Sequence, residues 1–216
     1  FPISNLQFPS FGLVISGGNT VLVKINQIVK YETLAATTDD ALGEALDKAA
    51  RMLGLGYPGG AVLEKFARLG NPKTYSLPIP IAGQEKRQIF TYSGLKTAFY
   101  RLVEKEKPLT KEKIYNLAAC FQDVAFEHLI RILRFALTNH YSPITNHLLV
   151  GGGVAANVEI RRRLRKLCKE FNIKLLTPYS KRLYGDNAAM IGVAAFLNPK
   201  YISLSQIDRL PNLKLE

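Results

Sequence analysis

Four short apolar runs along the chain predict β-strands. The runs 11–15 and 21–25 flank Ser16-Gly17-Gly18-Asn19-Thr20, a pattern typical of two strands joined in a hairpin. The run 148–150 is followed directly by three glycines, and the run 173–176 ends shortly before Pro178. Each run is too short for a helix of average length, so strands are the simpler interpretation.

Other segments repeat apolar residues at the three- and four-residue spacing of an amphipathic helix. Helices are therefore predicted at 39–53, 61–69, 110–139, 158–171 and 187–196, and a further helix opens at Ser93-Gly94-Leu95-Lys96-Thr97. Asp39 or Asp40 is the expected N-cap of the first helix, and Gly54 to Gly56 are expected to end it. Residues 70–88, rich in proline and polar side chains, predict an irregular surface loop. Strands that alternate with helices indicate an α/β fold with a mixed sheet.

Composition adds a basic character and sets limits on the class of protein. The chain has 216 residues, enough for one or two compact units, and no apolar run approaches the length of a membrane span. Lysine and arginine outnumber acidic residues 29 to 17, an excess that favours a polyanionic partner or simply a soluble surface. Cys120 and Cys168 both fall in predicted helices, which is typical of reduced core cysteines in a cytosolic protein.

The most informative motif is the glycine turn, Gly151-Gly152-Gly153-Val154-Ala155-Ala156-Asn157. It connects a predicted buried strand to a predicted helix that begins at Val158. Glycines allow a ligand to approach the main chain, and a helix N-terminus with open N–H groups favours an anion. The turn therefore predicts a nucleotide site, although it matches neither the Walker motif nor Gly-x-Gly-x-x-Gly.

Three further turns have the composition of ligand-binding loops: Ser16-Gly17-Gly18, Pro58-Gly59-Gly60 and Ser93-Gly94. Each alone fits a plain turn equally well, but with the glycine turn they suggest one cleft approached by several backbones. Asp40, Glu44 and Asp47 share one face of the first predicted helix. That face is either solvated or places Asp47 where its carboxylate accepts hydrogen bonds from ligand hydroxyls.

Asp186 comes directly before the last predicted helix, so its carboxylate is either an N-cap or a metal ligand. The three histidines show no paired spacing and are expected to be structural or exposed: His128, His140 and His147. No Ser-His-Asp order and no Cys-His pair stands out.

Six blocks in this order resemble the tRNA N6-adenosine threonylcarbamoyltransferase family, formerly called O-sialoglycoprotein endopeptidases. The blocks are Leu13-Val14-Ile15-Ser16-Gly17-Gly18-Asn19-Thr20, 39–48, 53–60, Tyr92-Ser93-Gly94-Leu95-Lys96-Thr97, 152–157 and Gly185-Asp186-Asn187-Ala188-Ala189-Met190-Ile191.

The resemblance implies the actin-like ATPase (ribonuclease H-like) fold, in which two α/β lobes enclose a nucleotide. Residues 1–216 would form mainly the second, C-terminal nucleotide-binding lobe with helical insertions, and most of the first lobe would be absent upstream. The adenylate would contact a set of residues carried over from the family motifs: Val14, Ile15, Ser16, Gly17, Gly18, Asp47, Gly60 and Asn157. Asp186 would be one ligand of a single metal ion, usually Fe²⁺ and sometimes Zn²⁺.

The implied reaction is an acyl transfer. A threonylcarbamoyl group would pass from threonylcarbamoyl-AMP to the N6 amine of an adenosine beside the tRNA anticodon, and AMP would leave. The metal and backbone donors would orient the adenylate, while no residue of this chain is identified as catalytic. The resemblance also implies that tRNA is a partner, that the protein acts in the cytoplasm, and that it works in a complex with a paralogous subunit, an accessory ATPase or both, or in a kinase-containing assembly.

One departure from the family is that its two metal-binding histidines, a His-x-x-x-His motif upstream of the Ser-Gly-Gly turn, are missing. We therefore expect a fragment that is inactive alone. The alternatives are a non-catalytic paralogue that serves as a scaffold and another actin-fold phosphotransferase. Asp47, Asn157 and Asp186 argue against a scaffold, and the block that begins at Ser93 argues against a phosphotransferase.

The predicted helix 158–171 also carries six cations, which form either a surface for tRNA phosphates or an ordinary solvated face: Arg161, Arg162, Arg163, Arg165, Lys166 and Lys169.

Overall fold

A computed structural model describes residues 6–142, 144–199, 201 and 203. Within these residues one mixed sheet has six strands in the order β4-β3-β2-β1-β5-β6. Their bounds are β1 Ser10–Ile15, β2 Thr20–Gln27, β3 Lys30–Thr37, β4 Ile89–Phe90, β5 His147–Gly151 and β6 Lys174–Leu176. β1, β2 and β3 form an antiparallel meander, which confirms the predicted hairpin, and β5 and β6 add parallel strands beside β1.

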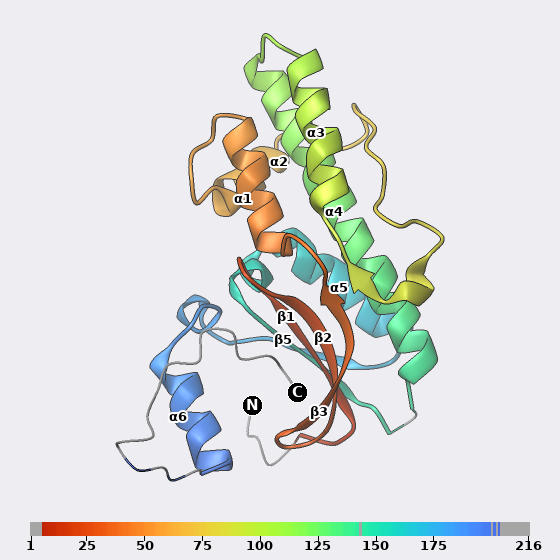
Figure 1. Cartoon of the computed structure of the whole chain (residues 1–216), viewed down its shortest axis with the longest axis vertical. Coiled ribbons are helices and arrows are strands. Elements are labelled where there is room, and N and C mark those ends of the chain that lie inside the picture. The colour runs from red at the N-terminus through yellow and green to blue at the C-terminus, as the bar shows by residue number, and fades with distance from the viewer. Residues whose placement is uncertain (1–5, 143, 200, 202, 204–216) are drawn as a thin grey trace.

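The helices are α1 Leu42–Met52, α2 Gly60–Ala67, α3 Ser93–Lys105, α4 Lys111–His140, α5 Val158–Glu170 and α6 Ala188–Leu197. Short 3₁₀ turns lie at η2 Glu85–Arg87, η3 Gly153–Ala156 and η4 Lys181–Leu183. Figure 1 shows α1, α2 and α3 gathered at one end of the molecule, with the long α4 running from there along the sheet. α6 lies apart from these helices, and none of its residues is buried.

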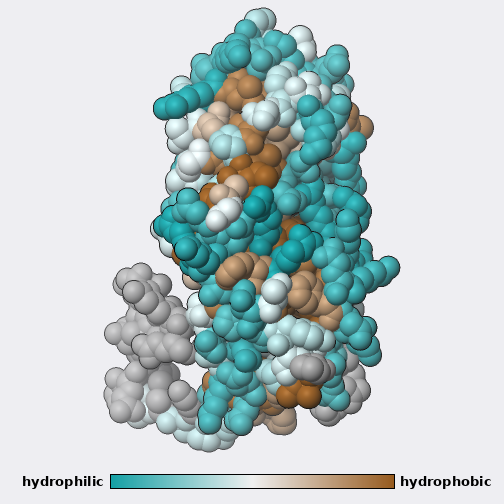
Figure 2. All heavy atoms as spheres, turned by 90° about the vertical axis from the view of Figure 1, so that its right-hand side faces the viewer, coloured by the Kyte–Doolittle hydropathy of each residue, from teal (hydrophilic) through white to brown (hydrophobic). Residues whose placement is uncertain are grey.

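Alternation along β1 separates the two faces of the sheet. Phe11, Leu13 and Ile15 are buried in the core that α4 and α5 help to form, whereas Val14 points the opposite way and is 42% exposed. On that opposite face an apolar cavity of about 490 Å³ lies over β1, β2 and β5. The side of the molecule to the right in Figure 1 is mostly hydrophilic, with a broken hydrophobic band along its length (Figure 2).

The predicted helices and the four predicted strands are confirmed, with ends that differ by up to three residues. β3 was not predicted, because in this strand only Leu34 and Ala35 are buried. Two adjacent buried residues give no alternating pattern, so the hydrophobic periodicity of the segment carries no strand signal.

The expected cap of α1 is wrong. Ala41 occupies the N-cap position without a side-chain bond, and the amide of Leu42 instead donates to the Thr20 hydroxyl, 2.8 Å away. The Asp39 carboxylate turns to the start of α3, where it accepts from the Tyr92 amide at 2.9 Å. The Thr20 hydroxyl of β2 thus accepts the hydrogen bond at the start of α1 that was expected to go to the side chain of Asp39 or Asp40.

The histidine and cysteine predictions hold where the structure tests them. His128 is buried and its Nε2 accepts from the Thr91 amide at 3.2 Å, and His147 is buried in β5. Burial lowers the pKa of His128 to about 4. Cys120 and Cys168 are buried free thiols, and burial raises their pKa values to about 11 and about 12.

Candidate functional site

A cavity of about 570 Å³ lies where the β1–β2 turn, α1, α2 and the start of α5 meet. We call it the glycine-lined cavity, and its walls are Gly17, Gly43, Leu46, Asp47, Pro58, Gly60, Ala61, Glu64, Lys65, Arg68, Gly153, Val154, Ala156, Asn157, Val158 and Arg161. Three of the four glycine-containing turns therefore meet in one place, as predicted. The fourth does not, because Ser93 and Gly94 are not among its walls.

Two glycines bring backbones together beside this cavity. The Gly43 amide donates to the Ser16 carbonyl oxygen at 3.0 Å, and a Cβ at Gly43 would lie 2.5 Å from that oxygen. Gly152 has φ +92°, and a Cβ there would lie 2.3 Å from the carbonyl oxygen of Ile15. Only glycine fits either approach, so these two residues set the position of α1 and η3 against the end of β1.

Asp47 joins α1 to the start of α2. Its Oδ1 accepts hydrogen bonds from the amides of Gly59 at 2.9 Å and Gly60 at 2.7 Å. These amides belong to the first turn of α2, where N–H groups lack partners within the helix. The carboxylate faces the cavity with one oxygen engaged, so Asp47 is not part of a plain solvated face.

The other two acids of the predicted face serve different partners. Asp40 forms ion pairs with Lys48 at 2.7 Å and Lys96 at 2.5 Å, and Glu44 shares Lys48 at 2.8 Å. Burial alone would raise the pKa of Asp40, but the hydrogen bonds from Lys48 and Lys96 outweigh it and hold that pKa below its usual value. The three acids thus do not act as one ligand-binding set.

The backbone N–H groups at the N-terminus of α5 are not open, so the expectation that they would be available to an anion is wrong. The Val158 amide donates to Glu64 Oε1 at 2.9 Å. The next two amides, of Glu159 and Ile160, donate to Asn157 Oδ1 at 2.9 and 3.2 Å. Side chains of the protein therefore satisfy the first turn of α5, and the helix does not present an unoccupied anion site of its own.

Glu64 and Gln122 are two residues of this region that sequence reasoning missed. Glu64 lies four residues after Gly60, so helical spacing places both on the same face of α2. Gln122 is only 6% exposed within the apolar stripe of α4, and its Oε1 accepts from Asn157 Nδ2 at 3.0 Å. A polar residue inside an apolar stripe is the signal that could have identified it.

The residues of β1 and of the β1–β2 turn that were predicted to contact the adenylate lie in different environments. Val14 faces the apolar cavity on the other side of the sheet, and Ile15 is fully buried in the core. The Ser16 hydroxyl accepts from the Asn19 amide at 3.0 Å, which closes the turn. Gly17 lines the glycine-lined cavity, and Gly18 is exposed.

Asp186 is exposed, and the N-cap of α6 is its neighbour Asn187, whose Oδ1 accepts from the Met190 amide at 3.0 Å. The helix-cap interpretation of Asp186 is therefore wrong. Within the described residues no group of three or more His, Cys, Asp or Glu side chains could hold a metal ion. One carboxylate falls short of the three protein ligands of a typical catalytic metal site, so these residues alone do not fit a metal.

The basic face of α5 is only partly free. Arg162 pairs with Glu159, and Arg163 pairs with Glu159 and with Asp123 of α4. Arg161 forms no ion pair with a described residue but donates to the Tyr184 hydroxyl at 3.3 Å. The other three cations of this face make no ion pair with any described residue: Arg165, Lys166 and Lys169.

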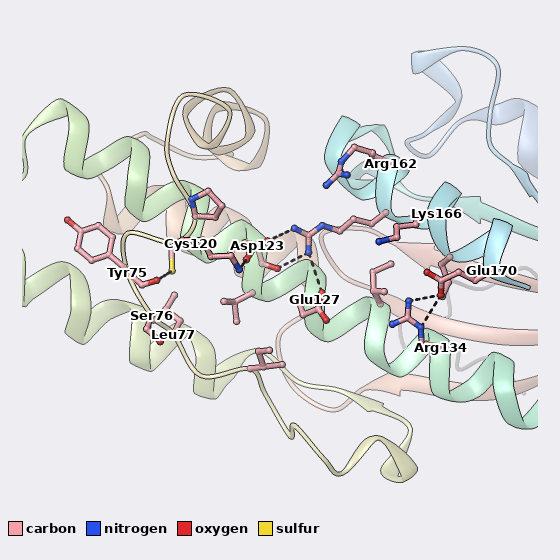
Figure 3. A pocket seen from close by; sticks show the side chains of 17 residues that line it. Tyr75, Ser76, Leu77, Cys120, Asp123, Glu127, Arg134, Arg162, Lys166 and Glu170 are labelled. Carbon is pink, nitrogen blue, oxygen red and sulfur yellow. Dashed lines mark hydrogen bonds and ion pairs between the residues drawn. The ribbon is translucent and has the colours of Figure 1, made fainter.

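A larger cavity of about 790 Å³ lies between the loop at 72–79, α4 and α5 (Figure 3). Its charged side chains largely neutralise one another, as in the pairs Arg163–Asp123 and Arg134–Glu170. It includes none of the glycine turns. The glycine-lined cavity, though smaller, is therefore the better candidate site.

Comparisons with known proteins agree with the sequence blocks. The profile of the tRNA N6-adenosine threonylcarbamoyltransferase family matches residues 2–193. Proteins of that name from Bartonella henselae and from a Cyanothece strain are 41% and 44% identical to this chain over 199 and 196 residues. These alignments cover 88% of this chain but only 54% and 55% of the relatives, so the chain spans about half of their length.

Among solved structures, HypF of T. kodakarensis is similar with a TM-score of 0.52 at 14% identity, over 87% of this chain and 33% of HypF. This similarity concerns the fold alone, and it confirms the expected actin-like ATPase fold. None of the described helices is long and apolar enough to cross a membrane.

Proposed function

Because this chain belongs to the tRNA N6-adenosine threonylcarbamoyltransferase family, we propose that it forms the adenylate-binding part of such an enzyme. The substrate would be threonylcarbamoyl-AMP, and the acceptor the N6 amine of an adenosine beside the anticodon of a tRNA. The observation that carries this proposal is the glycine-lined cavity, where Gly17, Asp47, Gly60 and Asn157 come together from separate segments.

The residues of the cavity suit the adenosine part of that substrate. One carboxylate oxygen of Asp47 accepts hydrogen bonds from the amides of Gly59 and Gly60. The other oxygen would accept hydrogen bonds from the ribose hydroxyls. Asn157 contributes an amide N–H, and the exposed backbone at Gly17 and Gly153 lets the ligand approach closely.

In the proposed reaction the adenosine N6 attacks the carbamoyl carbonyl carbon, the C–N bond forms, and the bond to the AMP phosphate oxygen breaks. The amine loses a proton, and AMP leaves with the electron pair of the broken bond. This chain would hold the AMP moiety in place, which favours the transfer by fixing the leaving group relative to the acceptor.

The rest of the enzyme would come from the region of the relatives that this chain does not span. We infer that Asp186 shares one metal ion, iron or zinc, with ligands from that region, and that the chain forms the C-terminal lobe. A paralogous subunit and an accessory ATPase or kinase are the proposed protein partners, and the cytoplasm is the proposed location.

The test is threonylcarbamoyl transfer to tRNA by a protein that joins this chain to the missing region of a relative. Asp186→Ala should abolish the incorporation of labelled threonine into tRNA, and Asn187→Ala, which removes only the cap of α6, should retain most of it. Full activity of Asp186→Ala would contradict the metal role. Transfer that survives Asp47→Ala together with Asn157→Ala would instead favour the scaffold alternative, with catalysis located in another subunit.

A further inference from the structure

Gln122 is a buried polar side chain at the back of the glycine-lined cavity. It lies in α4, is 6% exposed, and has buried Phe121 and Phe126 near it in the helix. A polar group in such surroundings is costly unless it makes a hydrogen bond. The bond that it makes is to Asn157, which is itself only 7% exposed.

The side-chain amide of Asn157 is consequently held from two sides. Its Oδ1 accepts from the amides of Glu159 and Ile160, and its Nδ2 donates to Gln122 Oε1 at 3.0 Å. The first two bonds fix the oxygen, and the third fixes the plane of the amide. One of the two Nδ2 hydrogens is thereby used, and the other has no hydrogen-bond partner among the described residues. Since Asn157 is one of the residues that line the glycine-lined cavity, this second hydrogen is available to a ligand there.

We propose that Gln122 is a positioning residue of the adenylate site, which aims the free N–H of Asn157 at the ligand without touching the ligand itself. This inference rests on the proposed function. Without the Gln122 acceptor, the buried Nδ2 of Asn157 loses a partner, and the amide can rotate or take up water. The N–H would then no longer be held toward the cavity before the ligand arrives.

Asp123, the next residue of α4, provides a matched control. Its carboxylate, labelled in Figure 3, pairs with Arg163 of α5. None of the hydrogen bonds of the Asn157 side chain to described residues involves Asp123. Both residues therefore connect α4 to α5, but only Gln122 reaches the amide that faces the cavity. A loss of stability is expected from changing either residue, whereas a loss of ligand affinity is expected from changing Gln122 alone.

The test uses AMP as the probe and calorimetric titration of the 216-residue chain. Gln122→Met, similar in length but without a strong acceptor, should weaken AMP binding about tenfold, the effect of about 1.4 kcal/mol. Gln122→Glu retains an acceptor oxygen and should bind within about twofold of the unaltered chain. Asp123→Asn should also bind within about twofold, although its thermal unfolding temperature falls.

A second readout follows the Asn157 side chain directly. In ¹H–¹⁵N spectra of the chain without ligand, the Asn157 side-chain NH₂ signals should shift in Gln122→Met and remain near their original positions in Asp123→Asn. Equal AMP affinity and unchanged Asn157 signals in Gln122→Met would overturn the role of Gln122 alone. If the unaltered chain binds no AMP, the proposed adenylate site fails, and the role of Gln122 fails with it.

Discussion

The carboxylate of Asp47 lies 2.7 Å from the backbone amide of Gly60, so one side chain connects two segments that the sequence places thirteen residues apart. Since Gly59 donates to the same oxygen, Asp47 caps α2 from the neighbouring helix. This contact shapes one wall of the glycine-lined cavity before any ligand is present. Its effects on stability and on ligand binding can be separated by substitution.

Asp47→Ala should lower the free energy of unfolding by about 1 to 2 kcal/mol, because two amides of the first turn of α2 lose their acceptor. Asp47→Asn keeps an acceptor oxygen and should lose less. Urea denaturation measures both variants, and AMP titration under native conditions measures affinity. An alanine variant as stable as the unaltered chain would show that the cap contributes nothing.

Gly152→Ala should destabilise the chain by about 3 kcal/mol or more. At φ +92° and ψ 156° the backbone is in a region that essentially only glycine adopts, and the added Cβ would meet the Ile15 carbonyl. Gly153→Ala is the matched control, because no atom lies within 4 Å of its added Cβ. It should cost less than about 1 kcal/mol. Equal losses in the two variants would contradict the close-packing argument.

The stability of the chain should depend on pH through His128. Burial lowers its pKa in the folded state to about 4, whereas the unfolded chain titrates near its ordinary value of about 6.5. Between these two values only the unfolded state binds the proton. The free energy of unfolding should therefore fall by about 1.4 kcal/mol per pH unit as the pH drops through this window, and the contribution is complete above about pH 6.5.

His128→Gln removes this titrating group and keeps an acceptor for the Thr91 amide. The stability difference between the unaltered chain and the variant should shrink by about 2 to 3 kcal/mol between pH 7 and pH 4.5, as measured by urea denaturation. Because the comparison subtracts one chain from the other, the pH dependence that both chains share cancels, and what remains is the contribution of His128. A difference that stays constant with pH would show that His128 does not carry the effect.

The free cations of α5 give a test of the tRNA surface. Changing Arg165, Lys166 and Lys169 to glutamine should weaken tRNA binding and lower the slope of log affinity against log salt by about 2 to 3 if each contacts a phosphate. The control changes three lysines elsewhere by the same charge: Lys24, Lys30 and Lys86. Equal effects of the two triple variants would favour an ordinary solvated face for α5.

Much of the fold could be predicted from the sequence because its signals are local. The apolar stripe of α4 and the glycines that follow α1 act within a few residues of where they stand. β3 gave no such signal, since its place in the sheet depends on pairing with β2. The cap of α1 could not be predicted either, because its acceptor is the hydroxyl of Thr20, twenty-two residues away.

The sequence by itself determined the family, the six helices, four of the six strands of the described sheet, and three of the turns that meet at the candidate site. Only the tertiary structure decided that Ser93 is not among the walls of the glycine-lined cavity. It also decided that Asp47 caps α2 and that Glu64 accepts from the first amide of α5. The physical reason is that these contacts are hydrogen bonds between segments distant in the chain. Such bonds form only when the helices pack on the sheet, and that packing cannot be predicted from a local pattern of residues.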